Sequence, residues 1–146
     1  MRIQFVSLLL ALLCATVLSL PEDGNPRYRK FINQHVIGRM SADRCDAVIR
    51  SRDITMTDSN ECKETNTFIL ATTKLIKPIC GRAGQPYGHL TKSLQPFSII
   101  VCTLRNQGAT RPNCQYRGQA RTRRIAIACN SGYPVHFDRD IAHFEN

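Results

Sequence analysis

A chain of 146 residues, 42% of them hydrophobic, can bury the core of one small domain, which argues against several domains. Its 20 lysines and arginines outnumber 11 acidic residues, for a formal net charge of +9 at pH 7. Residues 65–137 include ten basic side chains and no acidic one. Such a surface attracts polyanions, namely RNA, DNA, heparan sulfate or an anionic membrane, and charge alone does not choose among them.

The first 19 residues have the pattern of a secretory signal peptide. They combine a basic start at Arg2 with an apolar run from Phe5 to Leu18, and a polar switch follows at Pro21. The apolar run is shorter than the roughly 20 residues that a membrane-spanning helix needs. We therefore predict a signal peptide over residues 1–19, with cleavage between residues 19 and 23, and one secreted domain over residues 20–146.

The cysteines indicate disulfides rather than a metal site. Of seven cysteines, Cys14 leaves with the signal peptide, and the even number that stays predicts three disulfides in a secreted chain. Spacing alone does not choose their pairing. Zinc is the rival use, but the chain has no C-x-x-C pair. The six remaining cysteines are Cys45, Cys62, Cys80, Cys102, Cys114 and Cys129.

Two helices are predicted in the first part of the domain. The first begins after Asn25-Pro26, where apolar residues recur with helical spacing. A second helix is predicted from Ser41, its N-cap candidate, with Cys45, Val48 and Ile49 facing inward. The apolar stripe of the first helix consists of Tyr28, Phe31, Ile32, His35 and Val36.

Strands are predicted from residue 67 onward, where β-branched and aromatic residues alternate with Gly- and Pro-containing loops. Ile125, Ile127 and Cys129 alternate with alanines, which predicts a strand with one buried face. Helices followed by strands predict an α+β domain rather than alternating βαβ units. The predicted strands are 67–72, 97–104, 124–129 and 134–138, with loops at 81–88, 107–112 and 130–134.

Histidine chemistry is possible at two positions. His35 lies on an apolar stripe, where a polar ring needs a partner or a cleft. His136 precedes Asp138 by two residues on a predicted strand, so the carboxylate can orient the imidazole. A lone histidine is more often structural than catalytic, and nothing distinguishes the other two. The domain contains His35, His89, His136 and His143.

Two histidines and a lysine in a polycationic protein point to RNA cleavage. That reaction needs a base for the 2′-hydroxyl, an acid for the leaving 5′-oxygen and a cation for the charge on phosphorus. Lys63, directly after Cys62, is the candidate cation. No carboxylate cluster is present in the sequence to hold Mg²⁺, so we expect neither a metal nor another cofactor.

Three motifs occur in order along the chain: KFINQHV (30–36), CKETNTF (62–68) and PVHFD (134–138). Together they resemble the vertebrate pancreatic-type ribonuclease superfamily, whose signature C-K-x-x-N-T-F is matched at every fixed position. Cys80-Gly81, NCQYR (113–117) and IACN (127–130) fit as well. The resemblance covers essentially the whole mature chain and implies N-terminal helices packed on a bent antiparallel β-sheet.

The resemblance also implies a role for eight residues. His35 corresponds to the general base, His136 to the general acid and Lys63 to the lysine that stabilises the pentacoordinate phosphorane. The implied reaction is metal-independent cleavage 3′ of pyrimidines through a 2′,3′-cyclic phosphate. The supporting positions are Gln34 at the phosphate, Asp138 beside the acid histidine, Thr67 at the pyrimidine edge, Phe137 beside the base and Lys30 at a distal phosphate.

The same resemblance implies the disulfides Cys45–Cys102, Cys62–Cys114 and Cys80–Cys129. Residues 81–101 hold no cysteine, which is the three-disulfide arrangement of angiogenins and similar to that of fish ribonucleases. Arg139 replaces a glutamine that obstructs the pyrimidine pocket in angiogenins, so Arg139-Asp140 either closes this pocket or leaves it open. The basic run of the angiogenin nuclear-import signal is interrupted here, as Arg50-Ser51-Arg52-Asp53, and Asn130 stands where a glutamate is common.

We therefore expect a secreted, monomeric endoribonuclease acting on single-stranded RNA. One alternative is an angiogenin-type signalling factor that binds heparan sulfate or a cell-surface receptor through residues 81–92. Another is a cationic host-defence protein that damages bacterial membranes through its arginines. The three activities are compatible on one scaffold, and His136→Ala separates the first from the third.

Overall fold

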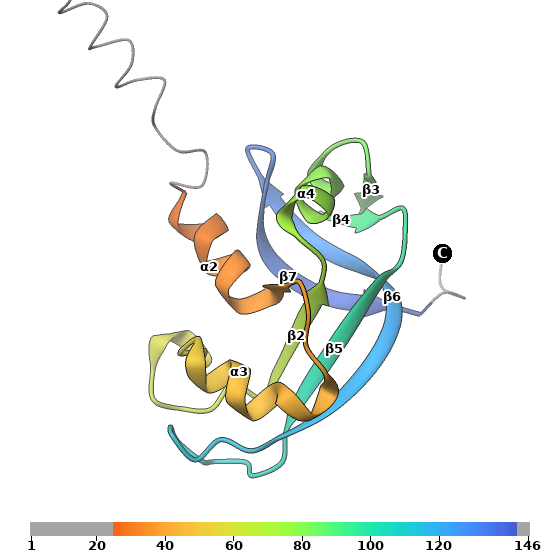
Figure 1. The fold of residues 1–146 in the computed structure, drawn as a ribbon. Helices are drawn as coiled ribbons and strands as arrows, with labels where there is room; N and C mark the ends of the chain where they lie inside the picture. Colours follow the sequence, from red (N-terminus) through yellow and green to blue (C-terminus); the bar gives the residue numbers. More distant parts are fainter. Residues whose placement is uncertain (1–24, 143–146) are drawn as a thin grey trace, which may run out of the picture.

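The computed structural model describes residues 25–142, so the predicted signal peptide and His143 lie outside the described residues. Between these limits, no helix has the length and apolar character needed to cross a membrane. Helices occupy the first part of this range and a strongly bent sheet the rest (Figure 1). The predicted α+β class, with N-terminal helices on a bent sheet, is confirmed.

The predicted first helix is present as α2, Pro26–His35. The Asn25 side chain accepts a hydrogen bond from the backbone N–H of Arg27 at 3.0 Å, and Pro26 occupies the first turn, where its missing N–H has no cost. Tyr28, Phe31 and His35 are buried along one side. The helix ends where Val36 turns into extended backbone, so the apolar stripe delivers His35 to the interior.

The second helix begins later than predicted. Ser41 precedes a 3₁₀ turn, Ala42–Arg44, and the α-helix is α3, Cys45–Ser51. The Ser41 hydroxyl does not cap the backbone, because it donates to the Asp43 carboxylate instead. The inward-facing residues of α3 are as predicted: Cys45, Val48 and Ile49.

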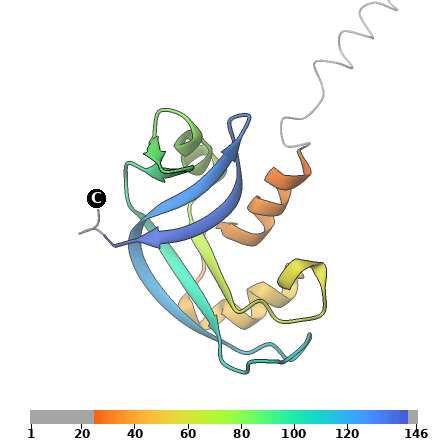
Figure 2. The same cartoon turned by 180° about the vertical axis from the view of Figure 1, so that it is seen from behind.

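One long strand, β6 (Tyr116–Asn130), connects the two halves of the sheet (Figures 1 and 2). Its first half pairs with β5, and its second half pairs with β7 on one side and β4 on the other. The sheet is antiparallel except for the short parallel pair of β1 and β2. The other strands are Val36–Ile37 (β1), Thr65–Leu70 (β2), Gly84–Tyr87 (β3), Leu90–Ser93 (β4), Phe97–Leu104 (β5) and Tyr133–Ile141 (β7).

Three differences from the predicted elements stand out. The predicted loop 81–88 contains β3, which pairs with β4 as a hairpin. The predicted strand 124–129 is only the second half of β6. The chain after β2 forms a short helix, α4 (Thr73–Ile76), and a 3₁₀ turn, Lys77–Cys80, that no periodicity indicated.

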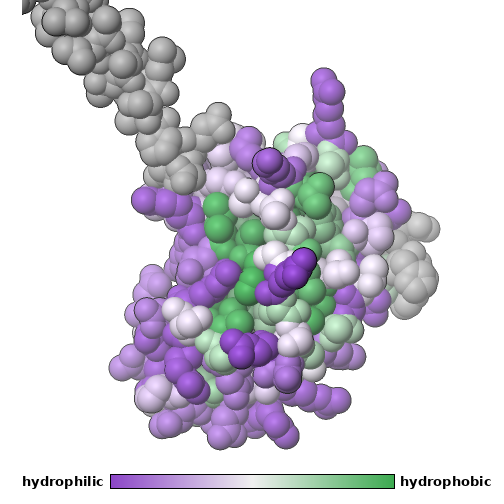
Figure 3. Space-filling view, viewed as in Figure 1, coloured by the Kyte–Doolittle hydropathy of each residue, from purple (hydrophilic) through white to green (hydrophobic). Residues whose placement is uncertain are grey.

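The core lies on both faces of β2 and β5. Ile69 and Ile99 pack in one cluster with Phe31 of α2, whereas Phe68 and Ile100 pack in a second cluster that includes α3. The prediction of a single buried face at residues 125–129 was wrong, because Ala126 is also fully buried, in a third cluster with Leu90 and Ile141. Figure 3 shows apolar residues in the middle of one face, with hydrophilic side chains around them and partly across them.

The three disulfides are those that the resemblance implied. Cys45–Cys102 joins α3 to β5, Cys80–Cys129 joins the 3₁₀ turn after α4 to β6, and Cys62–Cys114 joins the segments that precede β2 and β6. The bridges close separations of 57, 52 and 49 residues. Loops of this length restrict the unfolded chain by up to ~4 kcal/mol each in the chain-entropy model.

Candidate active site

A cleft of about 760 Å³ lies between α2, the segment 55–57, β2 and β7. It brings together His35, Lys63 and His136, which are far apart in the sequence. Gln34, Thr67, Phe137, Asp138 and Lys30 also line it, so all eight predicted site residues share one cleft. His89 is exposed in the turn between β3 and β4 and does not line the cleft.

His35 is buried at the end of α2, with 5% of its surface exposed. Its Nδ1 lies 2.8 Å from the Thr67 carbonyl oxygen. Because a carbonyl only accepts, Nδ1 carries the proton in this contact and Nε2 of the neutral ring keeps a lone pair. The Phe137 ring stacks on the imidazole at a centroid distance of 5.3 Å. The ring is therefore fixed in position and in tautomer.

The pKa of His35 is lowered from its ordinary value to about 3. Burial is the largest cause, because a charged ring loses its hydration there, and the charge of Lys63 adds to it. The Thr67 hydrogen bond acts in the opposite direction, and His136 lowers the pKa slightly further. The imidazole is consequently neutral over the physiological range and able to accept a proton.

Lys63 is held by a network that sequence reasoning found only in part. Its Nζ donates to the Asn66 Oδ1 at 2.9 Å, and the Asn66 Nδ2 donates to the Gln34 carbonyl at 2.8 Å. The Tyr116 hydroxyl donates to the Lys63 carbonyl at 2.7 Å, and the neighbouring Cys62 is in a disulfide. Asn66, 1% exposed, thus links the lysine to α2.

Burial lowers the pKa of Lys63 to about 8, with a smaller contribution from the charge of Lys30. A group with this pKa is still mostly protonated at neutral pH. The site therefore retains a partly desolvated cation, whose electrostatic effect is stronger than that of a lysine in water.

His136 lies on β7 and is 60% exposed. Its Nε2 is 3.9 Å from the Asp138 Oδ1, an ion-pair distance that is too long for a hydrogen bond. The other oxygen of Asp138 accepts a hydrogen bond from the Arg139 Nε at 2.7 Å. The pairing of β6 and β7 shifts between Ala126 and Ile127, so Asp138 sits in a β-bulge that modifies the simple two-residue alternation.

Lys30 lines the cleft and is paired with a carboxylate, that of Asp58. Its Nζ lies 3.4 Å from Asp58, and both side chains are largely exposed. Such pairs contribute little to stability and open readily. Asp58 follows Thr57, and both adopt left-handed backbone conformations (φ 59° and 45°), which is unusual for a β-branched residue such as Thr57.

Sequence reasoning missed an ion-pair cluster at the Thr67 side of the cleft. The Arg121 Nη1 lies 3.2 Å from the Asp140 Oδ2, and the Arg123 Nε lies 3.7 Å from the same oxygen. Arg121 and Asp140 line the cleft together with Thr67 and Val101. The contact depends on the pairing of β6 with β7 and β5, and no spacing in the sequence indicates it.

Arg52 belongs to the interrupted basic run, yet its side chain is engaged within the fold. One of its terminal nitrogens donates to the carbonyls of Val36 and Asn33, at 2.7 and 3.0 Å, and reaches that of Ile32 at 3.5 Å. The Asn33 Nδ2 donates back to the Arg52 carbonyl at 3.0 Å. The guanidinium therefore binds the Asn33 carbonyl in the last turn of α2 and the Val36 carbonyl directly after His35.

Comparisons with known proteins agree with this arrangement. The family model described as "Pancreatic ribonuclease" matches residues 26–138. The chain is 37% identical over 144 residues to "Ribonuclease-like 3" of Danio rerio, covering 94% of this chain and 96% of that protein. It is 44% identical over 119 residues to "Angiogenin-4" of Mus musculus, with 78% of each chain covered.

Solved structures give the same result. The X-ray structure of zebrafish RNase5 superposes with a TM-score of 0.77 at 48% identity, covering 82% of this chain and 98% of that one. The structure titled "RNASE ZF-1A" gives 0.76 at 47% identity, covering 82% and 95%. The chain therefore belongs to the pancreatic ribonuclease family and is a pancreatic-type ribonuclease similar to those of fish.

Proposed function

We propose that this protein is a secreted, monomeric endoribonuclease that cleaves single-stranded RNA on the 3′ side of pyrimidines, without a metal ion. The observation that carries the proposal is the contrast between the two cleft histidines. His35 is buried, tautomerically fixed and neutral, whereas His136 is exposed, with its Nε2 3.9 Å from the Asp138 carboxylate. The reaction needs one base for the 2′-hydroxyl, one acid for the 5′-oxygen and a cation near the phosphate, and the cleft contains all three.

The first step follows from these positions. The His35 Nε2 removes the proton of the ribose 2′-hydroxyl, and the 2′-oxygen forms a bond to phosphorus. The bond from phosphorus to the 5′-oxygen breaks, and His136 donates a proton to that oxygen. Lys63 faces the charge that grows on the phosphoryl oxygens, with Gln34 beside it. The products are a 2′,3′-cyclic phosphate and a free 5′-hydroxyl.

In the second step, water opens the cyclic phosphate with the roles reversed. His136, now neutral, removes a proton from water, and the protonated His35 returns one to the 2′-oxygen. The low pKa of His35 makes this ring a strong acid once it is charged. The cycle restores both histidines to their starting states.

The pyrimidine preference is assigned to the side of the cleft lined by Thr67, Phe137, Arg121 and Asp140. A threonine hydroxyl can donate or accept, so it can pair with the edge of uracil or of cytosine. The ion pair between Arg121 and Asp140 narrows this side of the cleft and disfavours the larger purines. Arg139 also lines the cleft and donates to Asp138, and the proposal is that this bond leaves room for a pyrimidine beside Thr67.

Lys30 is proposed to contact a phosphate further along the strand after releasing Asp58. The exchange replaces an exposed carboxylate by a phosphate, so its cost is small. This contact would raise the affinity for longer RNA without changing the chemistry at phosphorus.

A second candidate function is signalling of the angiogenin type, which the similarity to "Angiogenin-4" supports. The partner would be heparan sulfate or a receptor bound at residues 81–92 and the exposed Arg105, Arg117 and Arg124. Disruption of bacterial membranes is supported less, because Arg121 and Arg123 are paired with Asp140. Arg52, bonded to α2, is a poor candidate for a nuclear-import contact.

The test is cleavage of a fluorogenic UpA substrate by oxidatively folded residues 20–146, from about pH 3 to about pH 9. His136→Ala should lower the rate by about 10²–10⁴-fold. His89→Ala, which changes an exposed histidine outside the cleft, is the matched control and should not. Equal rates for the two variants would refute the two-histidine mechanism, and equal rates on UpA and GpA would refute the pyrimidine pocket.

A further inference from the structure

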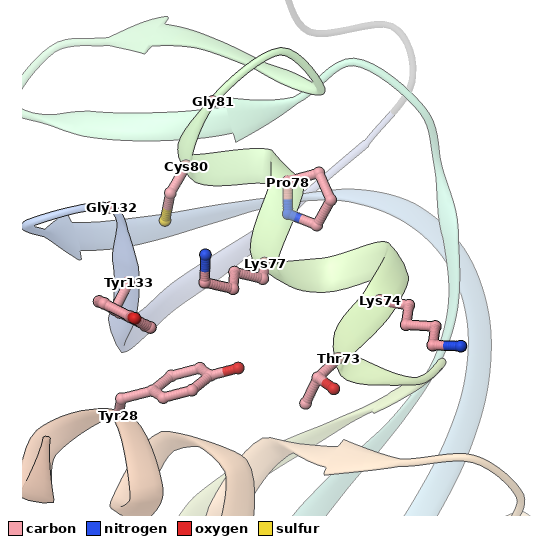
Figure 4. Close-up of a pocket in the computed structure, with 9 residues that line it drawn as sticks. All are labelled: Tyr28, Thr73, Lys74, Lys77, Pro78, Cys80, Gly81, Gly132 and Tyr133. Carbon is pink, nitrogen blue, oxygen red and sulfur yellow. The ribbon is translucent and has the colours of Figure 1, made fainter. Parts of the chain in front are cut away.

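A second hollow, of about 770 Å³, lies outside the cleft. It is bounded by the start of α2, by α4 with the following 3₁₀ turn, and by the turn that connects β6 to β7 (Figure 4). Tyr28 and Tyr133 form one side, and Lys77 and Thr73 another. The proposed mechanism uses none of these residues.

The side chains of the hollow combine aromatic surface with positive charge. The rings of Tyr28 and Tyr133 have centroids 4.9 Å apart at an angle of 52°, and the Lys77 Nζ lies 4.7 Å from the centre of Tyr133. Lys74 also lines the hollow, with its ammonium directed away from the tyrosines (Figure 4). None of the described residues that line it is acidic. Proteins bind single-stranded nucleic acids by stacking the bases on aromatic rings such as tyrosine and by pairing the phosphates with lysines.

The hollow adjoins the cleft along two elements. On α2, Arg27 lines the cleft and the next residue, Tyr28, lines the hollow. On β7, Tyr133 lies in the hollow and His136 in the cleft. Three strand residues span at most about 10 Å, and less here because the pairing of β6 with β7 shifts between Ala128 and Cys129. Two to three stacked nucleotides cover this length at roughly 3.4 Å each. A strand leaving the cleft can therefore reach the hollow.

The direction of that strand follows from His136. This residue faces the leaving 5′-oxygen in the proposed mechanism, so the RNA on its side of the cleft is the part 3′ of the cleaved bond. Arg27 and Lys30, both on α2, lie along the same path. They supply positive charge between the cleaved phosphate and the hollow.

We propose that the hollow binds an unpaired nucleotide of the RNA strand, about three positions 3′ of the cleaved bond. The base stacks on Tyr133 with Tyr28 beside it, and the phosphate binds Lys77 and Lys74. The phosphate draws the Lys77 ammonium off the Tyr133 ring and frees that face for the base. This inference rests on the proposed ribonuclease function, although the binding itself does not require cleavage.

The first test compares cleavage of UpA with cleavage of the same dinucleotide extended by four 3′ adenylates. In the unaltered protein, the extension should raise kcat/KM by at least about tenfold, which lies in the lower part of the range that one base–aromatic stack contributes. Tyr133→Leu and Lys77→Gln should each reduce this gain several-fold, keep the part that Lys30 contributes, and leave UpA cleavage unchanged. Tyr87→Leu is the matched control, because the Lys92 ammonium lies over the Tyr87 ring as Lys77 lies over Tyr133. Tyr87 lines neither the cleft nor the hollow, so this variant should retain the gain.

The second test separates the hollow from catalysis. A deoxyribonucleotide hexamer, which lacks the reactive 2′-hydroxyl, should shift the amide NMR signals of Tyr28, Lys77 and Tyr133 at lower concentration than AMP does. Shifts confined to the cleft would overturn the proposal, whether or not UpA is cleaved. Equal potency of AMP and the hexamer would also overturn it, because the hollow would then be a site for free nucleotides. Failure of UpA cleavage with the shifts intact would refute the ribonuclease mechanism alone.

Discussion

Replacing Arg52 by alanine tests whether this arginine holds the catalytic end of α2. The change removes the donor to the carbonyls of Val36 and Asn33, at 2.7 and 3.0 Å, and a longer contact to Ile32. Hydrogen bonds to a charged group are worth about 1.5–3 kcal/mol each. Water can reach the exposed Asn33 and replace part of this loss, so we expect the free energy of unfolding to fall by about 2–3 kcal/mol.

The effect on activity follows from the position of His35, the last residue of α2. Without the Arg52 donor to the Asn33 and Val36 carbonyls, the helix should fray at this turn, and the imidazole should lose its fixed position against Thr67 and Phe137. A displacement of about 1 Å in a catalytic group can cost about 10² in rate. We expect kcat for UpA to fall at least about tenfold, with a smaller change in KM.

Arg50→Ala is the matched control. It removes the same side chain and charge from α3, but Arg50 is exposed and makes none of these contacts. Thermal unfolding should show Arg52→Ala about 8–12 °C below Arg50→Ala, from about 4 °C per kcal/mol for a domain of this size. Equal melting temperatures and equal kcat values for the two variants would show that Arg52 neither stabilises α2 nor positions His35.

Three further predictions concern the same scaffold. Asn66→Ala removes the hydrogen bonds that link Lys63 to α2. The free energy of unfolding should fall by about 1–3 kcal/mol, and kcat should fall as well. An unchanged kcat would mean that Asn66 does not hold the lysine. Burial and the charge of Lys63 lower the pKa of His35 to about 3, so NMR titration of the free protein should find the ring uncharged at pH 5. Lys63→Gln should raise the pKa of His35, because it removes a nearby cation. A wild-type ring that titrates at the ordinary histidine value would contradict this account. In Gly118→Ala, the new Cβ would lie 1.9 Å from the backbone oxygen of Ala42, so the variant should lose about 3 kcal/mol or more; an unchanged melting temperature would show that the backbone yields.

Local patterns predicted the elements that bury a periodic face. The spacing of Tyr28, Phe31 and His35 identified α2, and the β-branched and aromatic residues of 97–104 identified β5 with its observed bounds. The first half of β6, residues 116–123, was missed because it is mostly polar and exposed. Pairing with β5, rather than its own composition, makes it a strand. The hairpin of β3 and β4 was missed for a similar reason, since its first strand contains both glycine and proline.

The sequence by itself determined which residue types carry the chemistry. The motifs around His35, Lys63 and His136 indicated a ribonuclease, and the resemblance implied the disulfide pairing that the fold contains. These features are readable because they depend on residue identity and on short spacings. They do not give the pKa of each group, which depends on how far the fold removes it from water and on the charges brought near it.

The tertiary structure alone decided the electrostatic state of these groups. His35 is neutral because α2, β2 and β7 enclose it beside Lys63. The Asp138 carboxylate contacts both His136 and Arg139, and Asp140 forms an ion pair with Arg121. The bulges and the register of β6 and β7 determine these contacts. Burial and register are properties of long-range packing, so no local pattern in the chain encodes them directly.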